Sequence, residues 1–140
     1  MRLRKLGITF FAAVVALLIP FSSAFAALDY LGRYGLTINT GEKAGSNLYY
    51  YRTEYVHSDG GSFKVCNYNM SSTKFFVYEY DPGSNNDDYV YSWTLGMNDC
   101  YTFTGLDKFK DGTNKKAELY VKAALASGGL AFERQVKLYD

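Results

Sequence analysis

Alternation of apolar and polar side chains is the feature that most limits how this chain can fold. Runs rich in β-branched and aromatic residues show this period of two along most of the sequence. Because successive side chains of a strand point to opposite faces of a sheet, such runs predict β-strands. The runs cover residues 34–40, 47–57, 62–69, 74–80, 88–95, 100–104, 119–125 and 130–138.

Turn-forming residues separate these runs, as at Ser58–Gly61, Asp81–Asn86 and Gly96–Asp99. Glycine supplies positive φ there, and Asp, Asn and Ser side chains close tight turns. About eight short strands with no convincing crossover helix predict an all-β fold. We expect one domain over residues 27–140, a small antiparallel β-sandwich that is immunoglobulin-like or jelly-roll-like. The cysteine and tryptophan spacing of immunoglobulin domains is absent.

Residues 114–127 allow two interpretations. Several alanines favour a helix that Asn114 would cap and Gly128 would end. However, Lys115 and Lys116 would then lie at the positive end of the helix dipole. The alternation through residues 119–125 favours a strand, joined by Gly128–Gly129 to the next run as a hairpin. We therefore expect a strand.

Residues 1–26 have the order of a signal peptide. Arg2, Arg4 and Lys5 are followed by an apolar run from Leu6 to Pro20, and residues 24–26 read Ala-Phe-Ala. A basic start, an apolar core and an A-x-A site predict cleavage after residue 26. The apolar run is shorter than the roughly 20 residues that span a bilayer. We expect a secreted protein, extracellular or periplasmic, without membrane insertion after cleavage.

Two cysteines occur in the chain, Cys66 and Cys100. In an oxidising compartment an even pair predicts a disulfide. A zinc site would need more Cys or His ligands than the chain contains.

Catalytic and cofactor motifs are absent, and we expect neither an enzyme nor a cofactor. The single histidine, His57, lies beside a glycine-rich turn that would position a general base poorly. Glu79 and Asp81 could form the carboxylate pair of a small glycoside hydrolase, but so small a domain leaves little material for a cleft. We regard this as the weakest alternative.

The loop around residues 81–88 offers oxygen ligands to calcium through Asp81, Asn85, Asp87 and Asp88. The EF-hand pattern fails there, because Asn86 stands where glycine is required and Ser92 where the bidentate glutamate should be. A plain polar loop is the simpler interpretation, so a calcium site remains the minor one.

Tyrosine is the one clear departure in composition, with 14 residues. Tyr49, Tyr51 and Tyr55 are expected to share one face of a strand, while Tyr50 takes the other. Only one face of a strand lies in the interior of a sandwich, so some of these rings are expected outside it. Favourable pairing of tyrosines across strands is the competing explanation for their number. Tyr49, Tyr51 and Tyr55 are therefore the candidate ligand-binding residues.

These features favour a secreted, non-enzymatic binding protein whose partner is a polysaccharide or an extracellular protein. An inhibitor or toxin-like effector acting through the 81–88 loop is the alternative. The chain has 15 Lys and Arg against 14 Asp and Glu, and this balance argues against nucleic acid as the partner. No pattern in the sequence fixes an oligomeric state.

Overall fold

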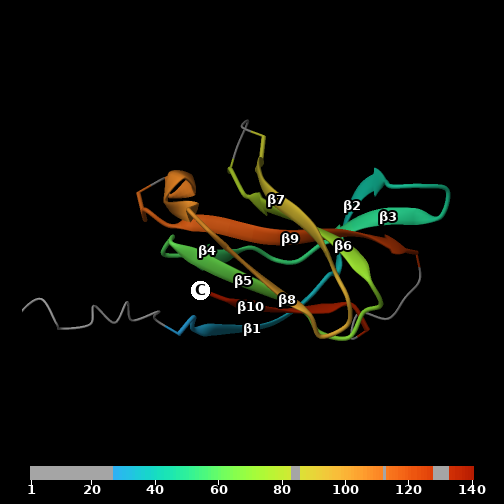
Figure 1. The fold of residues 1–140 in the computed structure, drawn as a ribbon. Helices are drawn as coiled ribbons and strands as arrows, with labels where there is room; N and C mark the ends of the chain where they lie inside the picture. Colours follow the sequence, from blue (N-terminus) through green and yellow to red (C-terminus); the bar gives the residue numbers. More distant parts are fainter. Residues whose placement is uncertain (1–26, 83–85, 112, 128–132) are drawn as a thin grey trace, which may run out of the picture.

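The computed structural model describes residues 27–82, 86–111, 113–127 and 133–140 (Figure 1). The predicted signal peptide, residues 1–26, lies outside these residues and stays a prediction. Over the described part of the chain, no helix has both the length and the apolar character needed to cross a bilayer.

The described residues include ten strands and a short 3-10 helix, joined by turns and loops. In chain order they are β1 (Tyr30–Gly35), β2 (Ile38–Lys43), β3 (Leu48–Arg52), β4 (Val56–Ser58), β5 (Ser62–Asn67), β6 (Thr73–Glu79), β7 (Asp88–Leu95), β8 (Cys100–Thr104), η1 (Leu106–Phe109), β9 (Ala117–Ala126) and β10 (Gln135–Tyr139). The prediction of a mostly antiparallel β-structure is confirmed.

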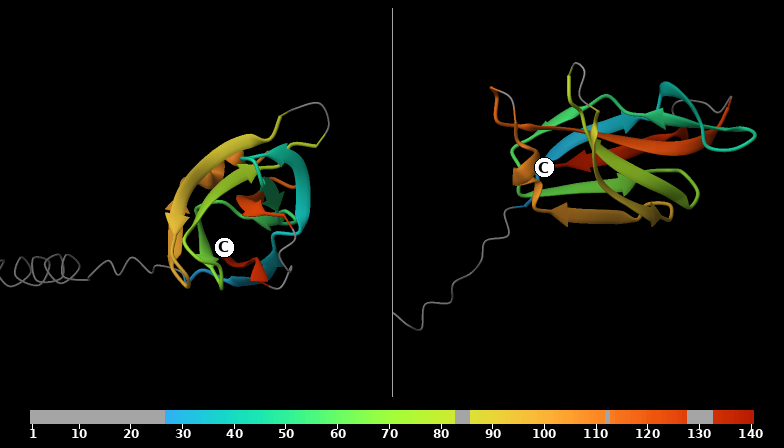
Figure 2. Two further views of the ribbon diagram at one scale, coloured as in Figure 1. Left: turned by 90° about the vertical axis from the view of Figure 1, so that its right-hand side faces the viewer. Right: turned by 90° about the horizontal axis from the view of Figure 1, so that it is seen from above.

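The strands form two sheets with antiparallel pairing throughout. A four-stranded sheet has the order β1-β10-β5-β8. A six-stranded sheet has the order β2-β3-β9-β6-β7, and β4 also pairs with β9. Figure 2 shows the two sheets curving around a common interior.

The pairing has the pattern of one long hairpin rolled up on itself. β6 and β7 form its tip, β5 pairs with β8 next, β3 and β4 share β9, and β1 closes on β10. Rolling then brings β10 beside β5 and β9 beside β6. Strands far apart in sequence therefore become neighbours, which places residues near both ends of the described chain on one surface.

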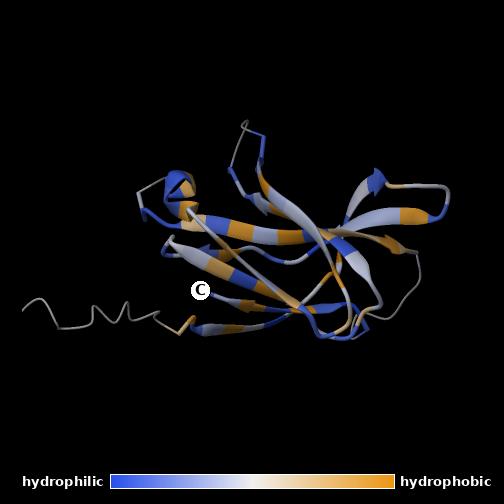
Figure 3. Cartoon of the chain, in the orientation of Figure 1, coloured by the Kyte–Doolittle hydropathy of each residue, from blue (hydrophilic) through white to orange (hydrophobic). Residues whose placement is uncertain are grey.

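The core lies between the sheets, on the inner face of each. The alternation of apolar and polar residues provides the apolar inner faces. Hydrophobic and hydrophilic residues follow one another along β5 and β9 (Figure 3). Fully buried side chains come from both sheets, namely Phe63, Val65, Phe75, Val77, Leu119, Val121, Val136 and Leu138. Each large apolar side chain buried in this way contributes about 1.5–3 kcal/mol.

The predicted strand over residues 47–57 is divided into β3 and β4, and this is one reason why ten strands replace the expected eight. Thr53, fully buried, lies in the gap. Its N–H donates to the carbonyl oxygen of Val121 over 2.9 Å. Its hydroxyl accepts from the N–H of Val121 over 3.1 Å. A side-chain oxygen thus replaces a carbonyl in the ladder, and the strand is interrupted without leaving a buried N–H unpaired.

The predicted strand over residues 34–40 is also divided, because the chain changes sheets there. Leu36 is buried in the core between β1 and β2, and its N–H donates to the carbonyl oxygen of Arg134 over 2.8 Å. An unbroken period of two therefore spans a crossing between sheets, which the sequence pattern does not distinguish from one strand.

Residues 117–126 form a strand, β9, which confirms the strand interpretation of residues 114–127. The predicted hairpin across Gly128–Gly129 is wrong. Those glycines lie outside the described residues, but the strands on either side, β9 and β10, belong to different sheets. Both edges of β9 are already occupied, by β3 and β4 on one side and by β6 on the other.

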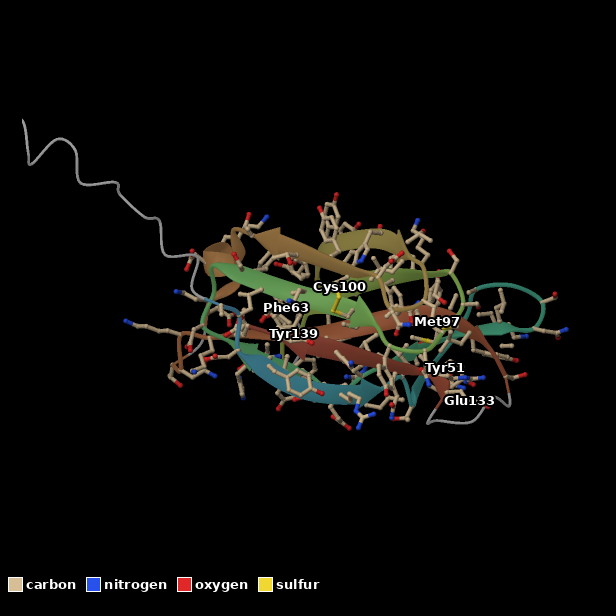
Figure 4. All side chains as sticks on the ribbon, turned by 60° about the horizontal axis from the view of Figure 1, so that its bottom comes forward. Tyr51, Phe63, Met97, Cys100, Glu133 and Tyr139 are labelled. Atoms are coloured by element: carbon tan, nitrogen blue, oxygen red, sulfur yellow. A yellow bond between two sulfur atoms is a disulfide. The ribbon has the colours of Figure 1, made fainter. Side chains whose placement is uncertain are left out.

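The predicted disulfide is confirmed. Cys66 on β5 and Cys100 on β8 are directly opposite each other in the sheet, with Cα atoms 4.0 Å apart. The bond closes a loop that contains the β6–β7 hairpin and lies on the outer face of the four-stranded sheet (Figure 4).

Candidate functional site

The three tyrosines predicted to bind a ligand do not form one exposed surface. Tyr51 packs against the core, and the guanidinium of Arg134 lies 5.1 Å from its ring centre. Tyr49 is half-buried on the same strand. Tyr55 is 42% exposed and stacks on Tyr80, with ring centres 5.0 Å apart. The period of two fails between Tyr51 and Tyr55 because β3 ends at residue 52.

Tyrosines and basic side chains instead meet on the outer face of the four-stranded sheet. They line a groove of about 500 Å³, which we call the basic groove; its residues are Tyr30, Arg33, Tyr68, Lys137 and Tyr139. Tyr30 is 55% exposed, so its ring is open to contact from solvent. Figure 4 looks toward this sheet and labels Tyr139 on β10.

A β-bulge in β1 brings two groove residues to the same face. Tyr30 and Arg33 are three positions apart, and in a regular strand they would point to opposite faces. The pairing of β1 with β10 shifts register between Tyr30 and Gly32, so Tyr30 lies opposite Tyr139 and Arg33 opposite Lys137. The bulge inserts one extra residue between Tyr30 and Arg33, so both side chains lie on the outer face.

The cations of the groove lie over aromatic rings. Tyr68 lies beneath both Arg33 and Lys137, at 5.0 and 4.5 Å from the ring centre. Lys64, opposite Tyr139 on β5, has its ammonium 4.2 Å from that ring. Cation–π contacts of this kind contribute about 0.5–1 kcal/mol at exposed sites.

Like charges lie side by side in the basic groove. Arg33 and Lys137 are direct cross-strand partners, an arrangement of like charges that destabilises a sheet. Over the described ranges, none of the ion pairs involves Arg33, Lys64 or Lys137. These cations are therefore available to an anionic ligand.

The outer face of the six-stranded sheet also carries rings, and one of its cations, Lys122, is held in an ion pair. Tyr50 lies there against Phe76, as the alternation predicted for Tyr50. The ammonium of Lys122 lies 4.6 Å from the Tyr50 ring centre and forms a 2.7 Å ion pair with Glu42. Burial, and a hydrogen bond donated to Asp87, raise the pKa of Tyr120 on this face.

A third group of rings bridges the edges of the two sheets. Tyr91 on β7 stacks on Tyr101 of β8 with centres 5.5 Å apart, and Trp93 lies against both. A hydrogen bond with Tyr91 raises the pKa of Tyr101. These side chains extend the core outward, because Trp93 also contacts Phe103.

Three of the four residues predicted as calcium ligands, Asp81, Asp87 and Asp88, lie among the described residues. The backbone N–H of Asp81 donates to Asp87 over 3.3 Å, and the other Asp87 oxygen accepts from Tyr120 over 2.6 Å. Asp88 is exposed, and Asn85 lies outside the described residues. Asp87 thus serves as an internal hydrogen-bond acceptor.

The carboxylates suggested for hydrolysis are in different surroundings. Glu79 is 2% exposed, whereas Asp81 is half-buried just beyond the end of β6. A carboxyl group as deeply buried as that of Glu79 is not accessible to a sugar chain in this conformation.

Residues 30–134 match the protein family described as YndA coiled coil domain. The match ends just before β10, the strand that lies between β1 and β5. None of the described residues lies in an α-helix, so this part of the chain forms sheets where the family description names a coiled coil.

The chain is similar to the uncharacterized protein YndA of Bacillus subtilis (strain 168). The two are 44% identical over 84 residues, which is 57% of this chain and 62% of that protein. The match therefore covers less than two thirds of the relative's length. No solved structure matches the chain.

Proposed function

The chain belongs to the family described as YndA coiled coil domain, and we propose that it is a secreted, non-enzymatic protein that binds an extracellular polysaccharide through the basic groove. The family description states no activity, and the chain's own surface supports this function. The observation that carries it is one groove that combines three tyrosine rings with cations that form no ion pair with any described residue.

Both kinds of side chain in the groove suit a sugar polymer. Tyrosine rings present an apolar face on which a pyranose can stack and a hydroxyl that can hydrogen-bond. Arginine and lysine donate charge-assisted hydrogen bonds to carboxylate, sulfate or phosphate groups. A polysaccharide with anionic substituents would use both, and it would relieve the repulsion between Arg33 and Lys137.

A disulfide ties together two strands of the sheet beneath the groove. Lys64, Cys66 and Tyr68 alternate along β5 and the residue that follows it, and Cys66 is opposite Lys137 on β10. The disulfide to Cys100 therefore lies beside the groove and ties β5 to β8. A preformed surface loses less conformational entropy on binding than a flexible one.

We propose further that the two sheets form a β-sandwich of the jelly-roll type. A hairpin that rolls up so that β1 pairs with β10, β5 with β8 and β6 with β7 supports this architecture. An immunoglobulin domain would keep its first two strands in one sheet, and here β1 and β2 lie in different sheets.

Secretion is supported by the predicted signal peptide and by the disulfide. Disulfides form and persist mainly outside the cytosol. The confirmed Cys66–Cys100 bond is therefore what an exported chain is expected to contain.

The proposal is tested by pull-down on two matched polymers, dextran sulfate and unmodified dextran, each coupled to beads. We expect retention on dextran sulfate alone and release by salt, because mobile ions screen exposed charges. The double variant Arg33→Gln/Lys137→Gln should bind about tenfold more weakly, as expected from losing two exposed ion pairs of up to ~1 kcal/mol each. Tyr30→Ala should weaken binding without unfolding the protein. Lys74→Gln, which removes an exposed cation from the other sheet, is the matched control.

Equal retention of all these variants would contradict the proposal, because it would mean that the groove is not the binding surface. Retention on neither polymer would also contradict it. Release of reducing sugar would favour the hydrolase alternative. Inhibition of a protease or of competitor cells, lost on substitution in the 81–88 loop, would favour the inhibitor alternative.

A further inference from the structure

Three acidic side chains meet at one end of the six-stranded sheet, where β6 ends and β9 begins. Glu79 is the last residue of β6, Glu118 is the second residue of β9, and Asp111 forms an isolated β-bridge with Lys116 in the segment between η1 and β9. One carboxylate oxygen from each of the three lies within 4.8 Å of the other two. We call these three residues the Glu79 cluster.

Backbone pairing fixes the positions of the two glutamates. Glu79 is opposite Leu119, so β6 and β9 hold Glu79 and Glu118 close together at their ends. The N–H of Tyr80 then donates to the carbonyl oxygen of Glu118 over 2.7 Å and continues the ladder beyond β6. The cluster is thus built on regular sheet and not on a flexible loop.

Glu79 is the unusual member of the cluster. It is 2% exposed, and its Oε1 has no hydrogen-bond partner among the described residues. A buried carboxylate oxygen without a partner loses hydration with no compensating interaction, and such groups are rare in folded proteins. Burial, with repulsion from Asp81, Asp111 and Glu118, raises the pKa of Glu79 from 4.5 to about 7.

The lysines near the cluster are paired elsewhere. The ammonium of Lys110 is 2.8 Å from Asp107, and that of Lys116 is 2.9 Å from Asp59. Within the part of the chain that the structure describes, the one ion pair that reaches the cluster joins His57 Nδ1 to Glu118 over 3.5 Å. Three carboxylates therefore share at most one weak cation.

The spacing of the oxygens fits one calcium ion. Calcium binds oxygen at about 2.3–2.6 Å, so two of its ligands lie at most about 5 Å apart. All three carboxylates of the cluster meet this condition. Half-buried Asp81 is adjacent, and burial together with repulsion from Asp111 raises the pKa of its carboxyl group. Calcium takes six to eight oxygen ligands, and water would supply those that remain.

We propose that Glu79, Asp111 and Glu118 bind one calcium ion, which ties the end of β6, the start of β9 and the segment after η1 together. The ion supplies the partner that Glu79 Oε1 lacks and offsets the mutual repulsion of the carboxylates. Its role is structural, and it does not depend on the polysaccharide proposal. The ligands differ from the loop set predicted from the sequence, although Asp81 lies next to the cluster and Asp88 is opposite Glu79 in the sheet.

The test uses the purified protein, stripped with EDTA and dialysed, and titrates CaCl₂ into it by isothermal calorimetry. We expect one site per chain with Kd on the order of 10⁻⁴ M, as in extracellular calcium modules. At 10 mM CaCl₂ the melting midpoint should rise by about 5–10 °C. The same concentration of MgCl₂ should have little effect, because Mg²⁺ needs shorter bonds and stricter geometry.

Variants then locate the site. Asp111→Asn is the primary one, because Asp111 is exposed and its substitution should not affect folding; it should weaken calcium binding at least tenfold. Glu79→Gln should abolish the calcium-dependent rise in melting temperature. Glu54→Gln, an exposed glutamate between β3 and β4, is the matched control and should bind calcium as the parent does.

Three results would overturn the proposal. The first is no heat and no thermal shift with CaCl₂ in the parent protein. The second is undiminished calcium binding by Asp111→Asn. The third is an equal thermal shift with MgCl₂, which would exclude a calcium-selective site.

Discussion

Replacing Glu79 by Gln should stabilise the calcium-free protein at neutral pH. The amide mimics the protonated carboxyl in size and removes a negative charge that is buried beside Asp81, Asp111 and Glu118. The pKa of Glu79 is raised from 4.5 in the unfolded chain to about 7 in the fold. Folding must therefore either protonate the group or bury its charge.

The sign of the pH dependence follows from linkage. Between pH 4.5 and 7 the folded state holds a proton on Glu79 that the unfolded state has lost, so unfolding becomes easier as pH rises. The contribution of Glu79 to stability is complete below pH 4.5 and is lost as pH rises through 7. A difference of 2.5 pKa units corresponds to about 3 kcal/mol at 1.36 kcal/mol per unit.

Urea unfolding at pH values from 4 to 8, in EDTA, measures this effect. The free energy of unfolding of Glu79→Gln minus that of the parent should increase by about 3 kcal/mol over this range. The other groups that face the cluster, namely Asp81, Asp111, Glu118 and His57, are the same in both proteins, so the difference reports on Glu79. Glu54→Gln should show no such trend. A difference that does not change with pH would refute the reasoning about Glu79.

Three further predictions concern the fold. The double variant Cys66→Ser/Cys100→Ser should lower the free energy of unfolding in urea by roughly 3–4 kcal/mol. The bond closes a loop across a 34-residue separation, and without it the unfolded chain gains conformational freedom. An unchanged midpoint would contradict this. Thr53→Val should lower the free energy of unfolding by about 1–3 kcal/mol, since the N–H of Val121 would lose its buried acceptor. The amide hydrogen of Val121 should then exchange faster with solvent. Unchanged exchange at Val121 would count against the role of the Thr53 hydroxyl. Far-UV circular dichroism should show a β-sheet spectrum without the double minimum of a coiled coil; that double minimum would contradict the sheet assignment.

Much of the fold could be predicted because its signals are local. The period of two identified the inner faces that became the core, as at Phe63 and Val65 on β5. The even cysteine count identified the Cys66–Cys100 bond. The alternation over residues 119–125 predicted a strand, whereas the alanine content favoured a helix, and the strand is correct. Both edges of β9 are paired within its sheet, and intrinsic helix propensity is weak beside such tertiary interactions.

Interruptions of strands could not be predicted, because they depend on distant partners. Thr53 ends β3 through bonds to Val121, 68 positions away. For the same reason Tyr51 turned inward and Tyr55 outward, and they do not form the single ring surface that their spacing indicated. The pairing partners of β9 and β10 lie in different sheets, so these two strands do not form a hairpin.

The functional surfaces were the least predictable part. The basic groove depends on a bulge at Tyr30 and Gly32 and on β10 lying between β1 and β5. The Glu79 cluster joins residues 79, 111 and 118, whose spacing matches no metal-binding motif. Neither arrangement leaves a local pattern in the sequence.

The most direct test of the polysaccharide-binding account is an NMR titration of ¹⁵N-labelled protein with a sulfated oligosaccharide of the dextran series. The account predicts chemical-shift changes concentrated on the basic groove, at Tyr30, Arg33, Tyr68, Lys137 and Tyr139, and far smaller changes at Tyr50 and Lys74 on the other sheet. Shifts centred on Tyr50 and Lys74, or no shifts at saturating ligand, would contradict it.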